Sequence, residues 1–288
     1  MIPAAFEYAR ATSLDEAVDA LGRAGGTTKV IAGGQSLLPL MKLRLAQPAR
    51  LLDIGRLGEL RGIRTLADGR VAIGALTTYA ELLDSPVRAY GLLADALPSI
   101  GDVQVRNRGT IGGAIAHADP ASDLPACLLA LDAELVARST RGERTLPIAT
   151  FFEGPFTTAL ADDELLTEIR LPGPRDDAGS AYVSIEQPAS GYALVGVAAV
   201  IARQGPGAPL SLVQIGITGV GPVAYRARGV EAALVGSDGS ARAIADAASH
   251  AVDGVVVNAD IHADREYRSE MAKVFTRRAL EAAAARIE

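Results

Sequence analysis

Two glycine-rich stretches carry the residue types best suited to chemistry in this chain. They are Gly33-Gly34-Gln35-Ser36 and, much later, Arg108-Gly109-Thr110-Ile111-Gly112-Gly113-Ala114. Successive backbone N–H groups in a tight glycine turn point into one concavity, and a helix that begins beside the turn adds partial positive charge. Such a turn binds phosphate without a basic side chain, and Gln35 and Ser36 add groups able to hydrogen-bond a pyrophosphate. The alternative is that adjacent glycines serve only a turn, and each stretch taken singly leaves that alternative open.

The standard nucleotide motifs do not account for these stretches. The chain has no Walker A pattern ending in Gly-Lys-Ser or Gly-Lys-Thr, and the first stretch is not a Gly-x-Gly-x-x-Gly fingerprint. Residues 219–224 have the letters of Gly-x-Gly-x-x-Ala, but they contain Pro222 and follow no alternating series of strands and helices. We therefore interpret residues 219–224 as a turn.

The elements around the first stretch predict a strand, a glycine turn and a helix in succession. Ser13 and Glu16 have the spacing of a capping box, which begins a short amphipathic helix that Gly25-Gly26 ends. Residues 29–32 are typical of a buried strand, and the segment after the glycines is rich in leucine, with Pro39 near its first turn. The first glycine stretch is therefore expected between a strand and a helix.

The second stretch is followed by turn and cap formers. Residues 119–123 read Asp-Pro-Ala-Ser-Asp and precede an apolar run that starts at Leu124. Between the two glycine stretches, Asp68-Gly69 predicts a hairpin that joins residues 63–66 to residues 70–73.

The last third of the chain has a different pattern. Residues 171–179 are dense in proline, glycine and aspartate and mark the best candidate boundary between domains. The pattern then predicts three strands, at 181–186, 192–202 and 210–218, and an alanine-rich helical pattern reaches the end. Strands followed by helices predict an α+β fold.

Composition excludes several classes of protein. The 288 residues, 49% of them apolar and 22% charged, predict an ordinary globular chain of roughly two domains. A net charge of −6, a pI near 5.2 and the lack of a basic block argue against nucleic acid as a partner. Cys127 is the sole cysteine, so this chain cannot itself hold a four-cysteine iron–sulfur cluster, and redox chemistry would need a bound cofactor. With no signal-peptide pattern and no run of ~20 apolar residues, the expected location is cytoplasmic, without a membrane span.

Two longer strings resemble a known family. AGGQSLLPLMKLRLAQP (Ala32 to Pro48) and RNRGTIGGAIAHADPASDLPA (Arg106 to Ala126) are similar to the FAD-binding medium subunit of the molybdenum hydroxylases, the group with aerobic carbon monoxide dehydrogenase and the xanthine dehydrogenase family. The resemblance covers nearly the whole chain. It implies a two-part FAD-binding domain of the PCMH type, residues 1–55 and 56–175, followed by a smaller α+β domain, residues 176–288, with an antiparallel sheet and helices.

The resemblance also implies which residues hold FAD. The first string implies residues on one side of the cofactor, and the second string implies residues on the other side. Four more residues match family positions near the cofactor: one acidic, two apolar and one aromatic. These residues are Ala32, Gly33, Gly34, Gln35, Ser36 and Leu37; Thr110, Ile111, Gly112, Gly113 and Ala114; and Asp123, Leu165, Leu166 and Tyr192. Gly191 stands where relatives commonly have Asp, and Glu186-Gln187-Pro188 replaces a stretch that is often basic.

Several of these residues have a structural alternative. Asp123 could be the N-cap of a helix, and Tyr192 could be the first residue of a core strand. Leu165 and Leu166 could be ordinary core residues. His117, inside the second string, either tunes the flavin or faces a partner, or it is a partly buried structural histidine. Cys127 lies in an apolar run without basic neighbours, which favours an inert core thiol.

The function that the resemblance implies is electron transfer. Electrons would pass from iron–sulfur clusters of a partner through FAD to an external acceptor, with no catalytic acid–base residue in this chain. The implied partners are a small subunit with two [2Fe-2S] clusters and a large molybdopterin subunit, assembled as a dimer of heterotrimers. Two alternatives remain: a free-standing flavin oxidoreductase, and a flavin-free scaffold subunit.

Overall fold

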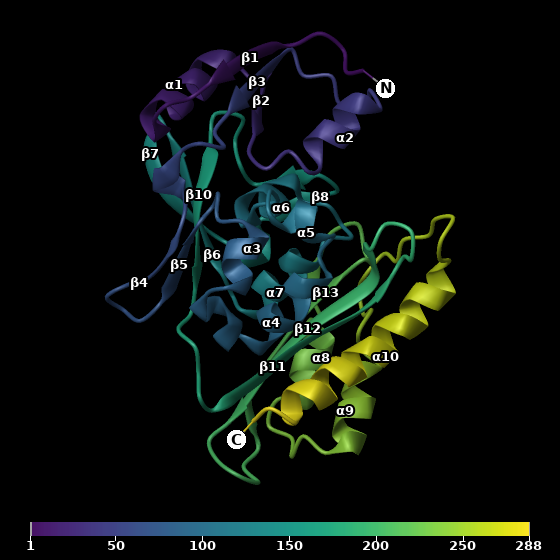
Figure 1. Cartoon of the computed structure of the whole chain (residues 1–288). Helices are drawn as coiled ribbons and strands as arrows, with labels where there is room; N and C mark the ends of the chain where they lie inside the picture. Colours follow the sequence, from purple (N-terminus) through teal and green to yellow (C-terminus); the bar gives the residue numbers. More distant parts are fainter. Residues whose placement is uncertain (1, 288) are drawn as a thin grey trace.

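The N-terminal part of the chain is a small parallel sheet with two helices. The computed structural model describes residues 2–287, and Figure 1 shows this part in purple and blue. Strand β3 lies between β1 and β2 and runs parallel to both. Its elements are β1 (Glu7–Arg10), α1 (Leu14–Ala24), β2 (Thr28–Ile31), α2 (Leu37–Lys42) and β3 (Arg50–Asp53).

Local signals explain the limits of α1. The Ser13 hydroxyl accepts a hydrogen bond from the Glu16 N–H at 3.2 Å, and Gly25 ends the helix with a φ of 53°. The Glu16 carboxylate accepts from the Thr12 N–H at 2.7 Å rather than from Ser13. The predicted N-cap is therefore present, but the Glu16 side chain accepts from the backbone of Thr12, one residue before the N-cap Ser13.

The middle part is an antiparallel five-stranded sheet covered by short helices. The strand order is β4-β5-β10-β6-β7, and the predicted hairpin at Asp68-Gly69 joins β4 to β5, with Ile63 opposite Ile73. A two-stranded β8-β9 hairpin lies apart from this sheet. The strands are β4 (Ile63–Thr65), β5 (Val71–Gly74), β6 (Glu134–Ser139), β7 (Gly142–Pro147), β8 (Phe152–Gly154), β9 (Thr157–Thr158) and β10 (Leu165–Leu171). The helices are α3 (Tyr79–Leu83), α4 (Gly91–Ser99), α5 (Val103–Arg106), α6 (Ile111–His117) and α7 (Asp123–Ala130), with 3₁₀ turns at Gly58–Leu60, Pro86–Ala89 and Ile148–Thr150.

The C-terminal part is an antiparallel four-stranded sheet with three helices. It contains β11 (Ala178–Glu186), β12 (Ala193–Arg203), β13 (Leu210–Thr218), β14 (Tyr225–Arg226), α8 (Arg228–Leu234), α9 (Ala241–Ala248) and α10 (Arg265–Ala284). Helix α10 packs along β11 and β12, and α4 and α7 of the middle part also pack against this sheet (Figure 1). The sheet is thus covered partly by the middle part and partly by its own helices, which together form the predicted α+β fold.

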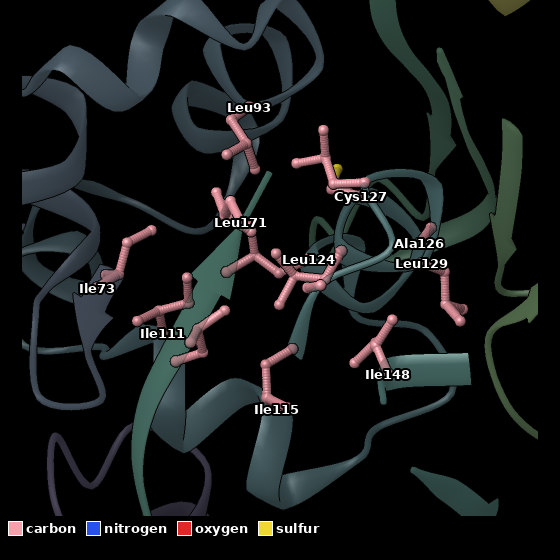
Figure 2. Packing of buried hydrophobic residues seen from close by; sticks show 14 of the residues in the cluster. Ile73, Leu93, Ile111, Ile115, Leu124, Ala126, Cys127, Leu129, Ile148 and Leu171 are labelled. Atoms are coloured by element: carbon pink, nitrogen blue, oxygen red, sulfur yellow. The ribbon is translucent and has the colours of Figure 1, made fainter. Parts of the chain in front are cut away.

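The largest core joins the middle and C-terminal parts. Figure 2 shows Ile111 and Ile115 of α6 gathered with Leu124 of α7 and Leu171 of β10. The same cluster includes Tyr182 and Ala198 from the C-terminal sheet, both 5% exposed or less. The packing that supports the second glycine stretch is therefore continuous with the C-terminal sheet.

Candidate functional site

The first glycine stretch lies between β2 and α2, as predicted. Gly34 has a φ of 76°, a left-handed conformation that favours glycine. Its carbonyl accepts from the Leu38 N–H at 3.0 Å, and the Ser36 carbonyl accepts from Leu40 at 3.3 Å. Within residues 2–287, the N–H groups of residues 33–36 have no hydrogen-bond acceptor. Backbone donors need partners, so this turn offers consecutive amides to an anionic ligand.

The two glycine stretches are in direct backbone contact. A Cβ atom on Gly33 would lie 2.8 Å from the carbonyl carbon of Arg108 and 3.1 Å from the Cα of Gly109, and closer still to the Arg108 oxygen. A pocket lies where the stretches meet. It is lined by Ala32, Gly33, Gly55, Arg61, Leu76, Thr78, Asn107, Arg108 and Thr110. Gly33 is therefore needed for contact between the stretches.

The second stretch uses most of its amides within the chain. The Ile111 N–H donates to the Thr77 carbonyl at 3.0 Å, and the Gly112 N–H donates to Ala75 at 2.9 Å. Thr110 caps α6, and its hydroxyl accepts from the Gly113 N–H at 3.1 Å. Free main-chain amides are therefore present in the first stretch. In the second stretch, the amides of Ile111, Gly112 and Gly113 bond within the chain and hold the stretch in place.

Asp123 is a buried carboxylate at the start of α7. Ser122 occupies the N-cap position, so the N-cap alternative for Asp123 is wrong. The side chain is 7% exposed, and its Oδ1 accepts a hydrogen bond from the Tyr182 hydroxyl. Burial raises the pKa of Asp123 to about 6, although the bond from Tyr182 acts in the opposite direction. Asp123 is therefore an acceptor that changes charge near neutral pH.

We expect Asp123→Asn to remove a pH-dependent contribution to stability. The pKa of Asp123 rises from 3.8 to about 6 on folding, so the proton favours the folded state. This stabilisation is complete below about pH 4 and is lost as the pH rises through about 6, a change of about 3 kcal/mol. Urea denaturation of flavin-free wild type and variant between pH 4 and 8 measures the difference. Parallel curves for the two proteins would contradict the prediction.

Tyr192 lies immediately before β12, and its side chain is 43% exposed. The strand begins at Ala193, so the alternative that Tyr192 starts a core strand is wrong. Burial of the ring raises the pKa of Tyr192, as does the charge of Asp119, and the nearby Ser36 side chain lowers it. Tyr192 from the C-terminal part therefore lies beside the first glycine stretch.

Leu165 and Leu166 lie on β10 and are 5% and 4% exposed. Leu165 packs in the N-terminal core with Leu76, and Leu166 packs in the large core. Neither residue lines the pocket between the glycine stretches. The structure thus places both leucines in the core, as the structural alternative predicted.

The remaining candidates do not form a further reactive centre. The ring of His117 lies 5.1 Å from that of Phe156, and burial lowers the pKa of His117. Cys127 is fully buried, which raises the pKa of its thiol and agrees with an inert core residue. Residues 2–287 contain no cluster of side chains able to hold a metal ion. Over the same range, every helix is too short or too polar to cross a membrane.

Sequence reasoning missed several residues of the site. Arg61 and Gly55 line the pocket from the segment after β3, and the Arg61 guanidinium donates to the Gly55 carbonyl at 3.3 Å. The sequence pattern does not mark Tyr182, although its hydroxyl holds Asp123. A tyrosine inside a β-strand pattern carries no signal of its own, because its partner is distant in sequence. Asn107 also lines the pocket, and its place within the second string is the one sequence signal that could have identified a missed residue.

The fold and the site together define a protein that binds a nucleotide cofactor, and family models specify its class. Residues 4–174 match the model described as "FAD binding domain in molybdopterin dehydrogenase". Residues 180–283 match the "CO dehydrogenase flavoprotein C-terminal domain". The cofactor is therefore FAD.

Known proteins resemble this chain along its full length. The carbon monoxide dehydrogenase medium chain of Hydrogenophaga pseudoflava is 42% identical over 99% of both chains. The glyceraldehyde dehydrogenase medium chain of Sulfolobus acidocaldarius is 39% identical over 97% of this chain and 98% of its own. A solved structure of carbon monoxide dehydrogenase from H. pseudoflava superposes with a TM-score of 0.96 at 44% identity, covering 100% of both chains. The chain belongs to the family of FAD-binding medium subunits of molybdenum hydroxylase complexes, whose members are flavoprotein subunits of multi-subunit dehydrogenases.

Proposed function

We propose that this subunit passes electrons from iron–sulfur clusters of a partner through FAD to an external acceptor. The observation that supports this proposal most strongly is the turn at residues 33–36, whose amides lack acceptors within residues 2–287. Its donors fit the diphosphate of FAD, because oxygen anions are the ligands that successive amides prefer. When bound, FAD supplies the redox chemistry, so the protein has to bind it, orient it and control access to it.

In this proposal each group of residues has a separate task. Residues 32–37 bind the diphosphate, and residues 110–114 support them from the adjoining backbone. Asp123 accepts hydrogen bonds from cofactor hydroxyl groups with its second carboxylate oxygen. Tyr192, exposed beside Ser36, faces the flavin ring. Leu165 and Leu166, buried on β10, occupy the apolar position near the flavin.

The proposed partners are a small subunit with two [2Fe-2S] clusters and a large molybdopterin subunit, in a dimer of heterotrimers. Cys127 is the only cysteine and is buried, so clusters with four cysteine ligands must come from another chain. The names of the relatives specify carbon monoxide and glyceraldehyde for otherwise similar medium chains. We propose accordingly that another subunit selects the primary substrate.

Flavin depletion of the assembled complex tests the proposed route. We expect the primary substrate still to reduce the iron–sulfur clusters after FAD is removed, while reduction of the external acceptor falls at least tenfold and returns on adding FAD. Rapid-mixing absorbance spectroscopy follows clusters and flavin separately. Native mass spectrometry of the same sample reports the partner masses. Acceptor reduction that is unchanged without FAD, or a chain that purifies alone, would contradict the proposal.

A further inference from the structure

The buried carboxylate of Asp123 is held by a residue of the C-terminal sheet. Tyr182 lies on β11, is 5% exposed, and donates its hydroxyl hydrogen bond to Oδ1 of Asp123. Gly196 on β12 leaves room for this hydroxyl, because a Cβ there would lie 2.9 Å from Cζ of Tyr182 and closer to its oxygen. The hydrogen bond from Tyr182 to Asp123 therefore depends on glycine at position 196.

The same sheet also fixes the backbone in front of Asp123. The hydroxyl of Thr218, on β13, lies 2.8 Å from the Pro120 carbonyl oxygen and 2.9 Å from that of Ser122. The Gly219 N–H donates to the Pro120 carbonyl at 2.8 Å. Thr218 is fully buried, so these bonds are shielded from water. The position of Asp123 is therefore set by β11 and β13 as well as by its own helix.

We propose that Tyr182 is a positioning residue for the cofactor site, whose hydroxyl orients the Asp123 carboxylate so that its second oxygen accepts hydrogen bonds from FAD hydroxyl groups. The inference rests on the proposed role of Asp123 in binding FAD. It extends the site to the C-terminal sheet, which the pocket between the glycine stretches does not reach.

The charged and titratable groups around Asp123 explain why a donor is needed there. Burial and the negative charges of Glu186 and Asp119 raise the pKa of Asp123, and the bond from Tyr182 opposes them. The other titratable neighbours are Tyr79 from α3, Tyr192, and Cys127 from the same helix; burial raises the pKa of each, which keeps them neutral near pH 7. Loss of the Tyr182 hydroxyl would leave the carboxylate more easily protonated.

Tyr182→Phe tests the proposal through the pH dependence of FAD binding. FAD is titrated into the flavin-depleted full chain from pH 4.5 to 8.5, and quenching of flavin fluorescence reports the dissociation constant. For the wild type we expect affinity to fall by up to about tenfold per pH unit once Asp123 is protonated. In Tyr182→Phe the midpoint of this fall should move to higher pH, by about half a unit or more, and affinity at pH 8.5 should change by less than threefold.

Two further variants separate this effect from general damage. Glu186→Gln removes a neighbouring negative charge, so its midpoint should move to lower pH, opposite to Tyr182→Phe. Tyr90→Phe is a matched control, because Tyr90 is 6% exposed and donates its hydroxyl to the Pro172 carbonyl, away from Asp123. Its profile should superimpose on that of the wild type.

The outcomes distinguish this inference from the proposed function. If Asp123→Asn keeps the pH dependence of the wild type, Asp123 does not bind FAD as proposed, and both statements fail for this residue. If Asp123→Asn abolishes the dependence but Tyr182→Phe leaves the midpoint unchanged, or weakens binding equally at every pH, Tyr182 is only structural. Either result overturns the inference, and the second leaves the proposed function intact.

Discussion

Replacing Gly33 by alanine should weaken FAD binding by about a hundredfold. The new Cβ would lie 2.8 Å from the carbonyl carbon of Arg108, which is backbone and cannot rotate away. The two glycine stretches would have to separate, and the amides of residues 33–36 would move with them. Overpacking of this kind costs about 1–3 kcal/mol, and the upper end corresponds to the expected loss of affinity.

Gly58→Ala is the matched control for this experiment. Gly58 lies in a 3₁₀ turn near the site, and a Cβ there meets no atom within 4 Å. Fluorescence titration with FAD and circular dichroism should show wild-type affinity for Gly58→Ala and an unchanged helix content for both variants. Normal flavin occupancy in Gly33→Ala would show that the contact between the stretches does not control cofactor binding.

Replacing Gly216 by alanine should destabilise the whole chain. Gly216 lies on β13, and its Cβ would lie 2.8 Å from the carbonyl carbon of Ala126 in α7 and closer to the oxygen. The sheet and the helix would have to move apart along a core that both share. We expect the free energy of unfolding to fall by about 3 kcal/mol, at the upper end for overpacked sites.

Gly154→Ala provides the comparison for Gly216→Ala. Gly154 is also in a strand, but its Cβ would come no closer than 3.8 Å to Thr157, an ordinary contact. Urea denaturation at pH 7 should therefore separate the two variants clearly. Equal midpoints would mean that α7 and β13 can shift without loss of packing.

Sequence reasoning predicted the parts of the site that depend on local signals. The strand, glycine turn and helix around residues 29–42 follow from hydrophobic pattern and glycine placement, and the structure confirms them. The Asp68-Gly69 hairpin is confirmed for the same reason. The family and the cofactor depended on two long strings, which the family models also recognise.

Other parts depend on contacts between distant residues, which no local pattern encodes. The amides of Ile111 and Gly112 are used by Thr77 and Ala75, more than thirty positions earlier. Asp123 looked like an N-cap because Asp before an apolar run is typical of one, yet Ser122 takes that position. Its actual partner, Tyr182, is 59 positions away and becomes visible only in the folded chain.

The cover that α4 and α7 provide for the C-terminal sheet has a consequence for biosynthesis. Residues 91–130 leave the ribosome well before β11, β12 and β13 exist, so the apolar sides of α4 and α7 that face this sheet are uncovered at first. During that interval the nascent polypeptide is at risk of aggregation and is a natural client for chaperones. Truncation before residue 178 would make this vulnerable state permanent, and we expect such fragments to accumulate as inclusion bodies.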